Sequence, residues 1–106
     1  MSRVLVACVL LAATSVPPHA RADTFKTTAY CLNGPTRSGE WTRPGVVAVD
    51  PRVIPLYSLV NIEGLGDGFE ALDTGGGVIG NHVDIWFGSC DRAIDYGVRY
   101  REVTWY

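Results

Sequence analysis

The sequence contains no cluster of basic residues and only two histidines. Its 106 residues hold nine Lys and Arg against eleven Asp and Glu, which gives a formal net charge of −2. Nucleic acids are bound largely through phosphate contacts from clustered Lys and Arg. A nucleic-acid partner is therefore not expected.

The sequence also lacks an apolar run long enough to span a bilayer. The longest run, Val4–Ala13, has about ten residues, whereas a membrane-spanning helix needs about twenty. The run follows Arg3 and precedes a polar segment that ends in Ala20-Arg21-Ala22, which is the order of a secretory signal peptide. We expect cleavage after Ala22, secretion to the periplasm or the cell exterior, and no membrane anchor afterwards. The alternative is an amphipathic first helix, but this run has no polar face.

Residues 23–106 then remain as a single small domain. All eleven acidic residues lie in this part, but only seven of the nine basic ones do, so its formal charge is −4. His82 is its only histidine, which excludes a site built from several histidines. We predict no metal and no cofactor, and the sequence gives no prediction of the oligomeric state.

Of the three cysteines, Cys8 lies in the predicted signal peptide, and Cys31 and Cys90 remain. Two cysteines in a small exported domain are expected to form a disulfide. Closing a loop of about 60 residues stabilises a fold by roughly 4 kcal/mol in the loop-entropy model. The alternative, a reactive thiol, is disfavoured because each cysteine has a partner.

Short β-type segments separated by Gly, Pro and Asn follow residue 24. The expected strands are 25–30, 46–49, 59–63, 69–73, 82–87 and 100–106. Loops are expected at 32–45 and 74–81, and a turn at 64–68. A helix is expected over 91–96, capped by Ser89 or Cys90 and ended by Gly97. This set of elements predicts a small closed or nearly closed β-barrel.

An aspartate follows or interrupts the face of an expected strand three times. Asp50 ends the face of the strand at 46–49, and Asp73 ends that of the strand at 69–73. Asp84 lies on one face of the strand at 82–87, together with His82 and Trp86, because side chains alternate along a strand. Carboxylates are seldom placed in apolar surroundings without a partner or a function.

Three segments around these aspartates occur in a specific order and spacing. They are VAVDP at 47–51 with IPL at 54–56, ALDTGG at 71–76, and IGNHVDIWF at 79–87. With TAY at 28–30, they resemble the 3D domain family, which is named for three aspartates and includes the catalytic domain of membrane-bound lytic transglycosylase A and the stationary-phase-survival muralytic proteins. The resemblance covers about residues 28–103.

The resemblance implies a mainly β fold, a small double-psi β-barrel with one short helix. It also implies cleavage of the β-1,4 bond between N-acetylmuramic acid and N-acetylglucosamine in peptidoglycan, without water and with a 1,6-anhydro product. By the same resemblance Asp84 is the catalytic acid/base, Asp73 is its neighbour in the site and Asp50 has a supporting part. Thr28 and Tyr30 match positions near the glycan cleft, and the partner is a peptidoglycan glycan strand.

The chemistry of these residues fits such a reaction. Protonating a glycosidic oxygen requires a neutral acid, and two carboxyl groups held close together raise the pKa of one of them. We expect Asp73 and Asp84 to form such a pair. Asp84 would give its proton to the leaving oxygen and then take one from the 6-hydroxyl of the sugar.

Further residues are candidates for supporting or substrate-binding roles. Thr74 is expected to hydrogen-bond Asp73 or a sugar hydroxyl, and Trp86 to pack against a sugar ring. Glycines of the 74–81 loop permit positive φ and a close approach of the backbone to a sugar. These glycines are Gly75, Gly76, Gly77 and Gly80.

Structural readings remain open beside the functional ones. Asp50 before Pro51 is typical of a turn, and Asp73 could form an Asx turn with the residues that follow it. Asp84 could be a buried structural hydrogen-bond acceptor. Trp86 is also compatible with a core position, and His82 with a structural or surface one.

The sequence departs from the family at two places. Tyr57-Ser58 stands where the family has Gly-Thr, and Ile79 stands where it has a lysine before Gly80. These departures favour the alternative function, a non-catalytic double-psi barrel module that binds wall glycan or a partner protein. Retention of all three aspartates favours the enzyme.

Overall fold

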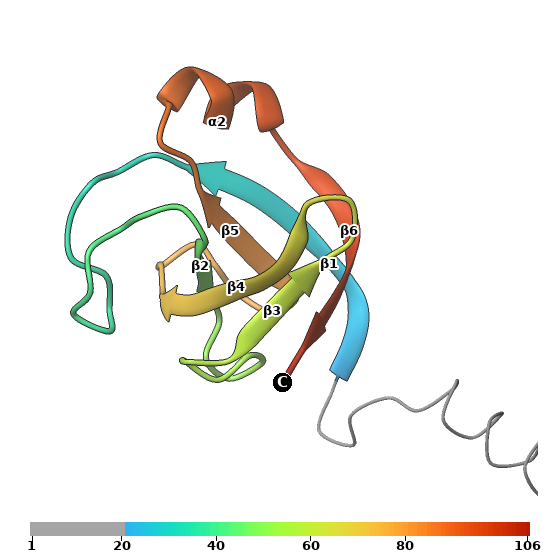
Figure 1. The fold of residues 1–106 in the computed structure, drawn as a ribbon. Helices are drawn as coiled ribbons and strands as arrows, with labels where there is room; N and C mark the ends of the chain where they lie inside the picture. The colour runs from blue at the N-terminus through green and yellow to red at the C-terminus, as the bar shows by residue number, and fades with distance from the viewer. Residues whose placement is uncertain (1–20) are drawn as a thin grey trace, which may run out of the picture.

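The computed structural model describes residues 21–106, which form six strands and one short helix (Figure 1). In chain order the elements are β1 (Arg21–Tyr30), β2 (Val46–Val49), β3 (Leu59–Ile62), β4 (Gly66–Asp73), β5 (His82–Trp86), α2 (Cys90–Tyr96) and β6 (Arg99–Trp105). The predicted signal peptide, residues 1–22, falls outside the described residues apart from its last two, which begin β1.

The six strands close into a barrel in the order β1-β5-β2-β4-β3-β6. Strands β1 and β5 run parallel, as do β2 and β4, while the other neighbouring pairs are antiparallel. A parallel pair requires a crossover connection, so the chain passes over the barrel rather than meandering around it. The predicted class, a small mainly β barrel with one short helix, is confirmed.

The barrel interior is filled by apolar side chains from every strand, because alternate residues point inward. Val47 and Val49 of β2 and Val83 and Ile85 of β5 are at most 3% exposed. Burying a side chain of this size contributes about 1.5–3 kcal/mol. The remaining buried members of this core are Phe25, Ile54, Val60, Ile62, Ala71, Tyr96 and Val103.

Helix α2 lies across one end of the barrel (Figure 1) and begins at Cys90, one residue earlier than expected. Ser89 is its N-cap and accepts a hydrogen bond from the Arg92 amide. Gly97 ends it with φ 63° and donates its amide proton to Ala93. Seven residues are too few for a helix stable by itself, so packing of its Tyr96 into the core holds it.

Two strand boundaries differ from the expectation. β1 begins at Arg21 rather than at 25, because its early residues pair with β6 from Trp105 back to Arg99. β4 begins at Gly66, because Gly66 pairs with Ile62 of β3, and the predicted turn at 64–68 is shorter than expected. The other strand ends lie within one residue of their predicted positions.

Tyr57 keeps the backbone conformation that suits the glycine found there in the family. Its φ is 74°, and its amide donates a hydrogen bond to Ala71 of β4 at 2.8 Å. The side chain is 66% exposed. A left-handed conformation costs a non-glycine residue about 1–2 kcal/mol, so this turn carries backbone strain at Tyr57.

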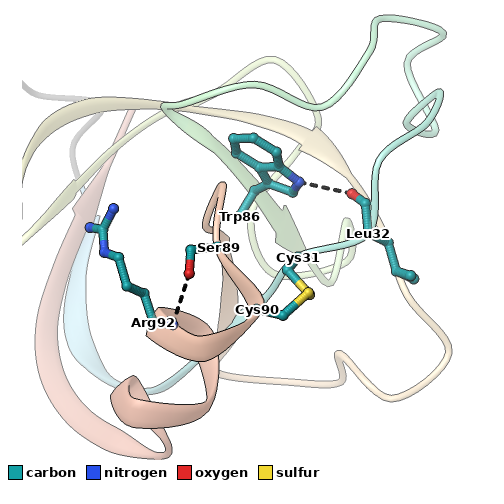
Figure 2. Close-up of a disulfide and its surroundings, with 6 residues drawn as sticks. All are labelled: Cys31, Leu32, Trp86, Ser89, Cys90 and Arg92. Carbon is teal, nitrogen blue, oxygen red and sulfur yellow. Dashed lines mark hydrogen bonds between the residues drawn. A yellow bond between two sulfur atoms is a disulfide. The ribbon is translucent and has the colours of Figure 1, made fainter.

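The predicted disulfide joins Cys31 and Cys90, with a Cα–Cα distance of 5.1 Å (Figure 2). Cys31 directly follows β1 and Cys90 begins α2. The Trp86 indole donates a hydrogen bond to the Leu32 carbonyl at 2.8 Å, as Figure 2 shows. The start of the 32–45 loop is therefore fastened to the barrel by one covalent bond and one hydrogen bond.

Removing the disulfide is expected to destabilise the domain severely. The bridge spans 59 positions, for which loop entropy gives about 4 kcal/mol. The double variant Cys31→Ser/Cys90→Ser should melt at least about 15 °C lower than the wild type by calorimetry. All variants are measured as the full chain, in which Cys8 is still present. Cys8→Ser is then the matched control and should leave the melting temperature unchanged. A double variant that melts within about 5 °C of the wild type would rule out the disulfide as a major source of stability.

Candidate carboxylate site

The strand register brings four residues into one row across β1, β5, β2 and β4. Thr28 pairs with Asp84, Asp84 pairs with Ala48, and Ala48 pairs with Asp73. Neighbouring strands lie about 4.8 Å apart, so the backbones of the two aspartates are separated by roughly 10 Å. The expected meeting of Asp73 and Asp84 thus has a structural basis, with the small side chain of Ala48 between them.

Asp84 is half-buried, and its carboxyl group has one side-chain donor. The Thr28 hydroxyl donates to Asp84 Oδ1 at 2.8 Å. Burial raises the pKa of Asp84, while the Thr28 hydrogen bond and nearby His82 oppose the rise. Asp73 adds to the raised pKa but is the smallest of the causes. The expected direction is correct, but the main cause is desolvation rather than the second carboxylate.

Asp73 accepts three hydrogen bonds. The Tyr30 hydroxyl donates to Oδ2 at 2.9 Å, and the amides of Arg37 and Thr74 donate to Oδ1 at 3.0 and 2.9 Å. Thr74 therefore binds Asp73 through its backbone amide rather than through its hydroxyl. Burial and then the Asp73 hydrogen bond raise the pKa of Tyr30, and the charge of Asp84 contributes. Tyr30 is thus held as a neutral donor to Asp73.

Asp50 is 4% exposed and connects two loops. It accepts hydrogen bonds from the Arg52 amide and guanidinium at 2.9–3.0 Å and from the Gly80 amide at 2.8 Å. The Arg52 guanidinium is the main reason why the pKa of Asp50 lies far below its usual range, and the Gly80 amide adds to this. Asp50 therefore forms a turn, and it also ties the β2–β3 loop to the glycine loop before β5.

The glycine loop, residues 74–81, uses positive φ at one of its four glycines. Gly80 has φ 72°, whereas Gly75, Gly76 and Gly77 do not adopt positive φ. A Cβ atom at Gly76, Gly77 or Gly80 would meet open space, whereas one at Gly75 would lie 3.1 Å from Val78. The backbone at Gly76, Gly77 and Gly80 is therefore open to a ligand.

Two hollows of about 250 Å³ flank the strand ends. Asp73 and Tyr30 line one of them together with the 32–45 loop, at Leu32, Asn33, Gly34, Pro35 and Thr42. Trp86 lines the other, with Phe69, Phe87 and Arg92. The indole ring thus borders a different hollow from the one at Asp73, and its hydrogen bond to Leu32 lies between them.

His82 and the amide of Arg37 are contacts that the sequence did not reveal as part of the site. His82 Nε2 lies 2.7 Å from the Thr28 hydroxyl oxygen. The sequence pattern that could have placed His82 in the site is its position two residues before Asp84, on the same face of β5. Within residues 21–106, no group of three or more His, Cys, Asp or Glu side chains could hold a metal ion. In the same range no helix has the length and apolar character needed to cross a membrane.

Comparison with known proteins finds a match to the model of the 3D domain over residues 45–106. Three proteins of Bacillus subtilis (strain 168) are similar to the chain. The SPbeta prophage-derived uncharacterized protein YorM is 38% identical over 90 residues, which cover 74% of this chain and 38% of YorM.

The cell wall-binding protein YocH is 48% identical over 54 residues, which cover 51% of this chain and 18% of YocH. The putative cell wall shaping protein YabE is 46% identical over 52 residues, which cover 49% of this chain and 12% of YabE. The chain therefore spans well under half the length of each of these relatives.

Replacing Asp50 is expected to destabilise the fold in a pH-dependent way. The folded-state pKa of Asp50 lies below its unfolded value, so its stabilisation is present above about pH 4 and is lost as the pH falls further. Asp50→Asn should lower the melting temperature by about 5 °C or more at pH 7. The difference from the wild type should shrink below about pH 4.

The control is Glu40→Gln, which breaks an exposed ion pair with Arg43 and should change stability little. An Asp50→Asn variant as stable as Glu40→Gln at pH 7 would show that Asp50 does not hold the two loops together.

Proposed function

This chain belongs to the 3D domain family, and we propose that it acts at the cell wall as a lytic transglycosylase on peptidoglycan. The names of two relatives, YocH and YabE, support a role connected with the cell wall. The observation that supports catalysis is the row formed by Thr28, Asp84, Ala48 and Asp73. In that row Asp84 has both the burial and the raised pKa of a general acid.

The first step of the proposed reaction is a proton transfer from Asp84. Its carboxyl group gives a proton to the oxygen that joins C1 of N-acetylmuramic acid to O4 of N-acetylglucosamine. The C1–O4 bond breaks, and its electron pair stays on the departing O4. Burial favours the neutral acid needed for this step, and a bound sugar that displaces water raises the pKa of Asp84 further.

The second step closes the anhydro ring. The Asp84 carboxylate takes the proton of the 6-hydroxyl, whose oxygen bonds to C1 of the same muramic acid residue. The products are an N-acetylglucosamine end and a 1,6-anhydro-muramic acid end, and Asp84 is again protonated. No water is consumed, so the carboxylate spacing that distinguishes hydrolytic glycosidases does not apply.

Asp73 and Tyr30 stabilise the charge that develops between these steps. The carboxylate of Asp73 is fixed by its three donors, so it need not reorganise when positive charge builds up at C1. Tyr30 also places a phenol donor beside the hollow that Asp73 lines. The open backbone at Gly76 and Gly80 provides an approach for the glycan.

The proposal includes export and processing. Removal of residues 1–22 would leave Asp23 within β1 as the first residue, and the disulfide would form in the oxidising compartment that the enzyme reaches. The substrate lies outside the cytoplasm, so export is required for the proposed function.

A wall-binding module is the second candidate. The cell wall-binding name of YocH supports it, as does Ile79, an exposed apolar residue where the family has a lysine. The two candidates differ in one product, the 1,6-anhydro end.

Purified protein incubated with peptidoglycan sacculi is expected to release muropeptides with 1,6-anhydro ends. Mass spectrometry identifies them, because each is about 18 Da lighter than the corresponding hydrolysis product. Sacculi without protein are the control for ends already present. Intact glycan with the protein bound to it would favour the binding module, and reducing ends without anhydro sugar would indicate a hydrolase.

Asp84→Asn is expected to remove at least about 99% of this activity, because an amide cannot donate the reacting proton. The variant should melt within a few degrees of the wild type or slightly higher at pH 7. The folded-state pKa of Asp84 is raised, so its ionised form opposes folding as the pH increases, and asparagine removes that cost.

The matched control is Asp67→Asn, an exposed aspartate of β4, which should keep full activity. Two outcomes for Asp84→Asn would argue against Asp84 as the acid. One is retained activity, and the other is loss of the cooperative melting transition.

A further inference from the structure

His82 is a titratable side chain at the site that the proposed reaction does not use. It begins β5, two residues before Asp84, and is 9% exposed. Its Nε2 lies 2.7 Å from Thr28 Oγ1, and the same oxygen lies 2.8 Å from Asp84 Oδ1. The three side chains therefore form one hydrogen-bonded chain from the imidazole to the carboxyl group.

The protons in this chain are constrained because the Thr28 hydroxyl has only one. When Thr28 donates to Asp84 Oδ1, its oxygen must accept from His82, which requires a proton on Nε2. When Thr28 instead donates to Nε2, its oxygen can accept only from a protonated Oδ1 of Asp84. The tautomer of His82 and the position of the proton on Asp84 are thus linked through one hydroxyl group.

We infer that His82 is a positioning residue for Asp84, which directs the Thr28 hydroxyl proton to Oδ1 and leaves the reacting proton on Oδ2. This inference rests on the proposed function for its catalytic consequence, but not for the hydrogen-bonded chain itself. Because Oδ1 accepts the hydrogen bond from Thr28, Oδ2 is the oxygen from which Asp84 donates its proton to the glycosidic oxygen.

The surroundings of His82 favour a neutral ring. Burial and the charge of Lys26, its partner in β1, lower the pKa of His82, while Asp84 and the Gly77 carbonyl raise it. A neutral imidazole has one N–H for two acceptors, the Gly77 carbonyl and Thr28 Oγ1. An ionised Asp84 attracts the Thr28 proton and so draws that N–H to Nε2. The other titratable groups near Asp84 are Asp73 and Tyr30. They are hydrogen-bonded to each other rather than to His82.

Imidazole ¹⁵N NMR tests the chain without any substrate. The full chain with His19→Gln has a single histidine, so its two nitrogen shifts report His82 alone. At neutral pH we expect the Nε2–H tautomer. Thr28→Val removes the hydroxyl and should move the proton toward Nδ1, whereas Thr28→Ser should leave the tautomer as in the wild type. An Nδ1–H ring in the wild type, or no change in Thr28→Val, would overturn the inference.

Activity provides the second arm, with His82→Met removing the ring nitrogens and His82→Gln restoring an N–H donor. We expect about a tenfold loss of kcat in His82→Met and recovery of most of it in His82→Gln. Loss of the polarised donor raises the pKa of Asp84. The basic limb of the pH–rate profile should therefore move upward by about 0.5 pH unit in His82→Met. An unchanged profile in His82→Met would contradict the inference.

The two arms separate the inference from the proposed function. The expected ¹⁵N shifts without anhydro products would retain the hydrogen-bonded chain and reject the transglycosylase. Anhydro products from a protein whose His82 carries its proton on Nδ1 would retain the transglycosylase and reject the hydrogen-bonded chain. The NMR arm uses a chain that retains His82, so it does not depend on the folding of His82→Met.

Discussion

The pairing of β1 with β5, β5 with β2 and β2 with β4 is the constraint on which the rest of this site depends. It sets Thr28, Asp84, Ala48 and Asp73 side by side, although they come from segments far apart in the chain. A slip of one residue in any of these pairs would turn a functional side chain to the opposite face of the barrel. Closure of the six strands leaves no free edge at which such a slip could begin.

The three aspartates differ in the donors that surround their carboxyl groups. Asp50 accepts four hydrogen bonds, three of them from Arg52, and the low pKa that results makes it a structural anion. Asp73 accepts three and is fixed beside a hollow. Asp84 accepts one from a side chain, and burial raises its pKa. Burial is the main cause of this raised pKa, which fits the role of Asp84 in the proposed reaction.

Much of the fold follows from local patterns in the sequence. Short β-type runs bounded by turn residues identified β2 and β5 to within one residue, and the cysteine count identified the disulfide. The aspartate motifs predicted that Asp73 and Asp84 share a site. The register places them in one row, on either side of Ala48, and their shared role in a reaction stays a prediction. These features depend on neighbouring residues or on counting, which a sequence displays directly.

The parts that sequence reasoning missed depend on contacts made by barrel closure. The amide of Arg37 reaches Asp73 across 36 positions, and His82 reaches Thr28 across 54. Desolvation, the main cause of the raised pKa of Asp84, likewise depends on what covers the side chain. The conformations of Gly75 and Gly76 are set by their loop rather than by residue type.

The central claim is that burial in the folded barrel raises the pKa of the Asp84 carboxyl group. The most direct measurement is a ¹³C NMR titration of that carboxyl carbon in the intact protein, with the resonance assigned by its absence in Asp84→Asn. The account predicts a midpoint above the usual aspartate value of about 4. A midpoint at or below that value would contradict it, because the side chain would then be an ordinary anion with no proton to give.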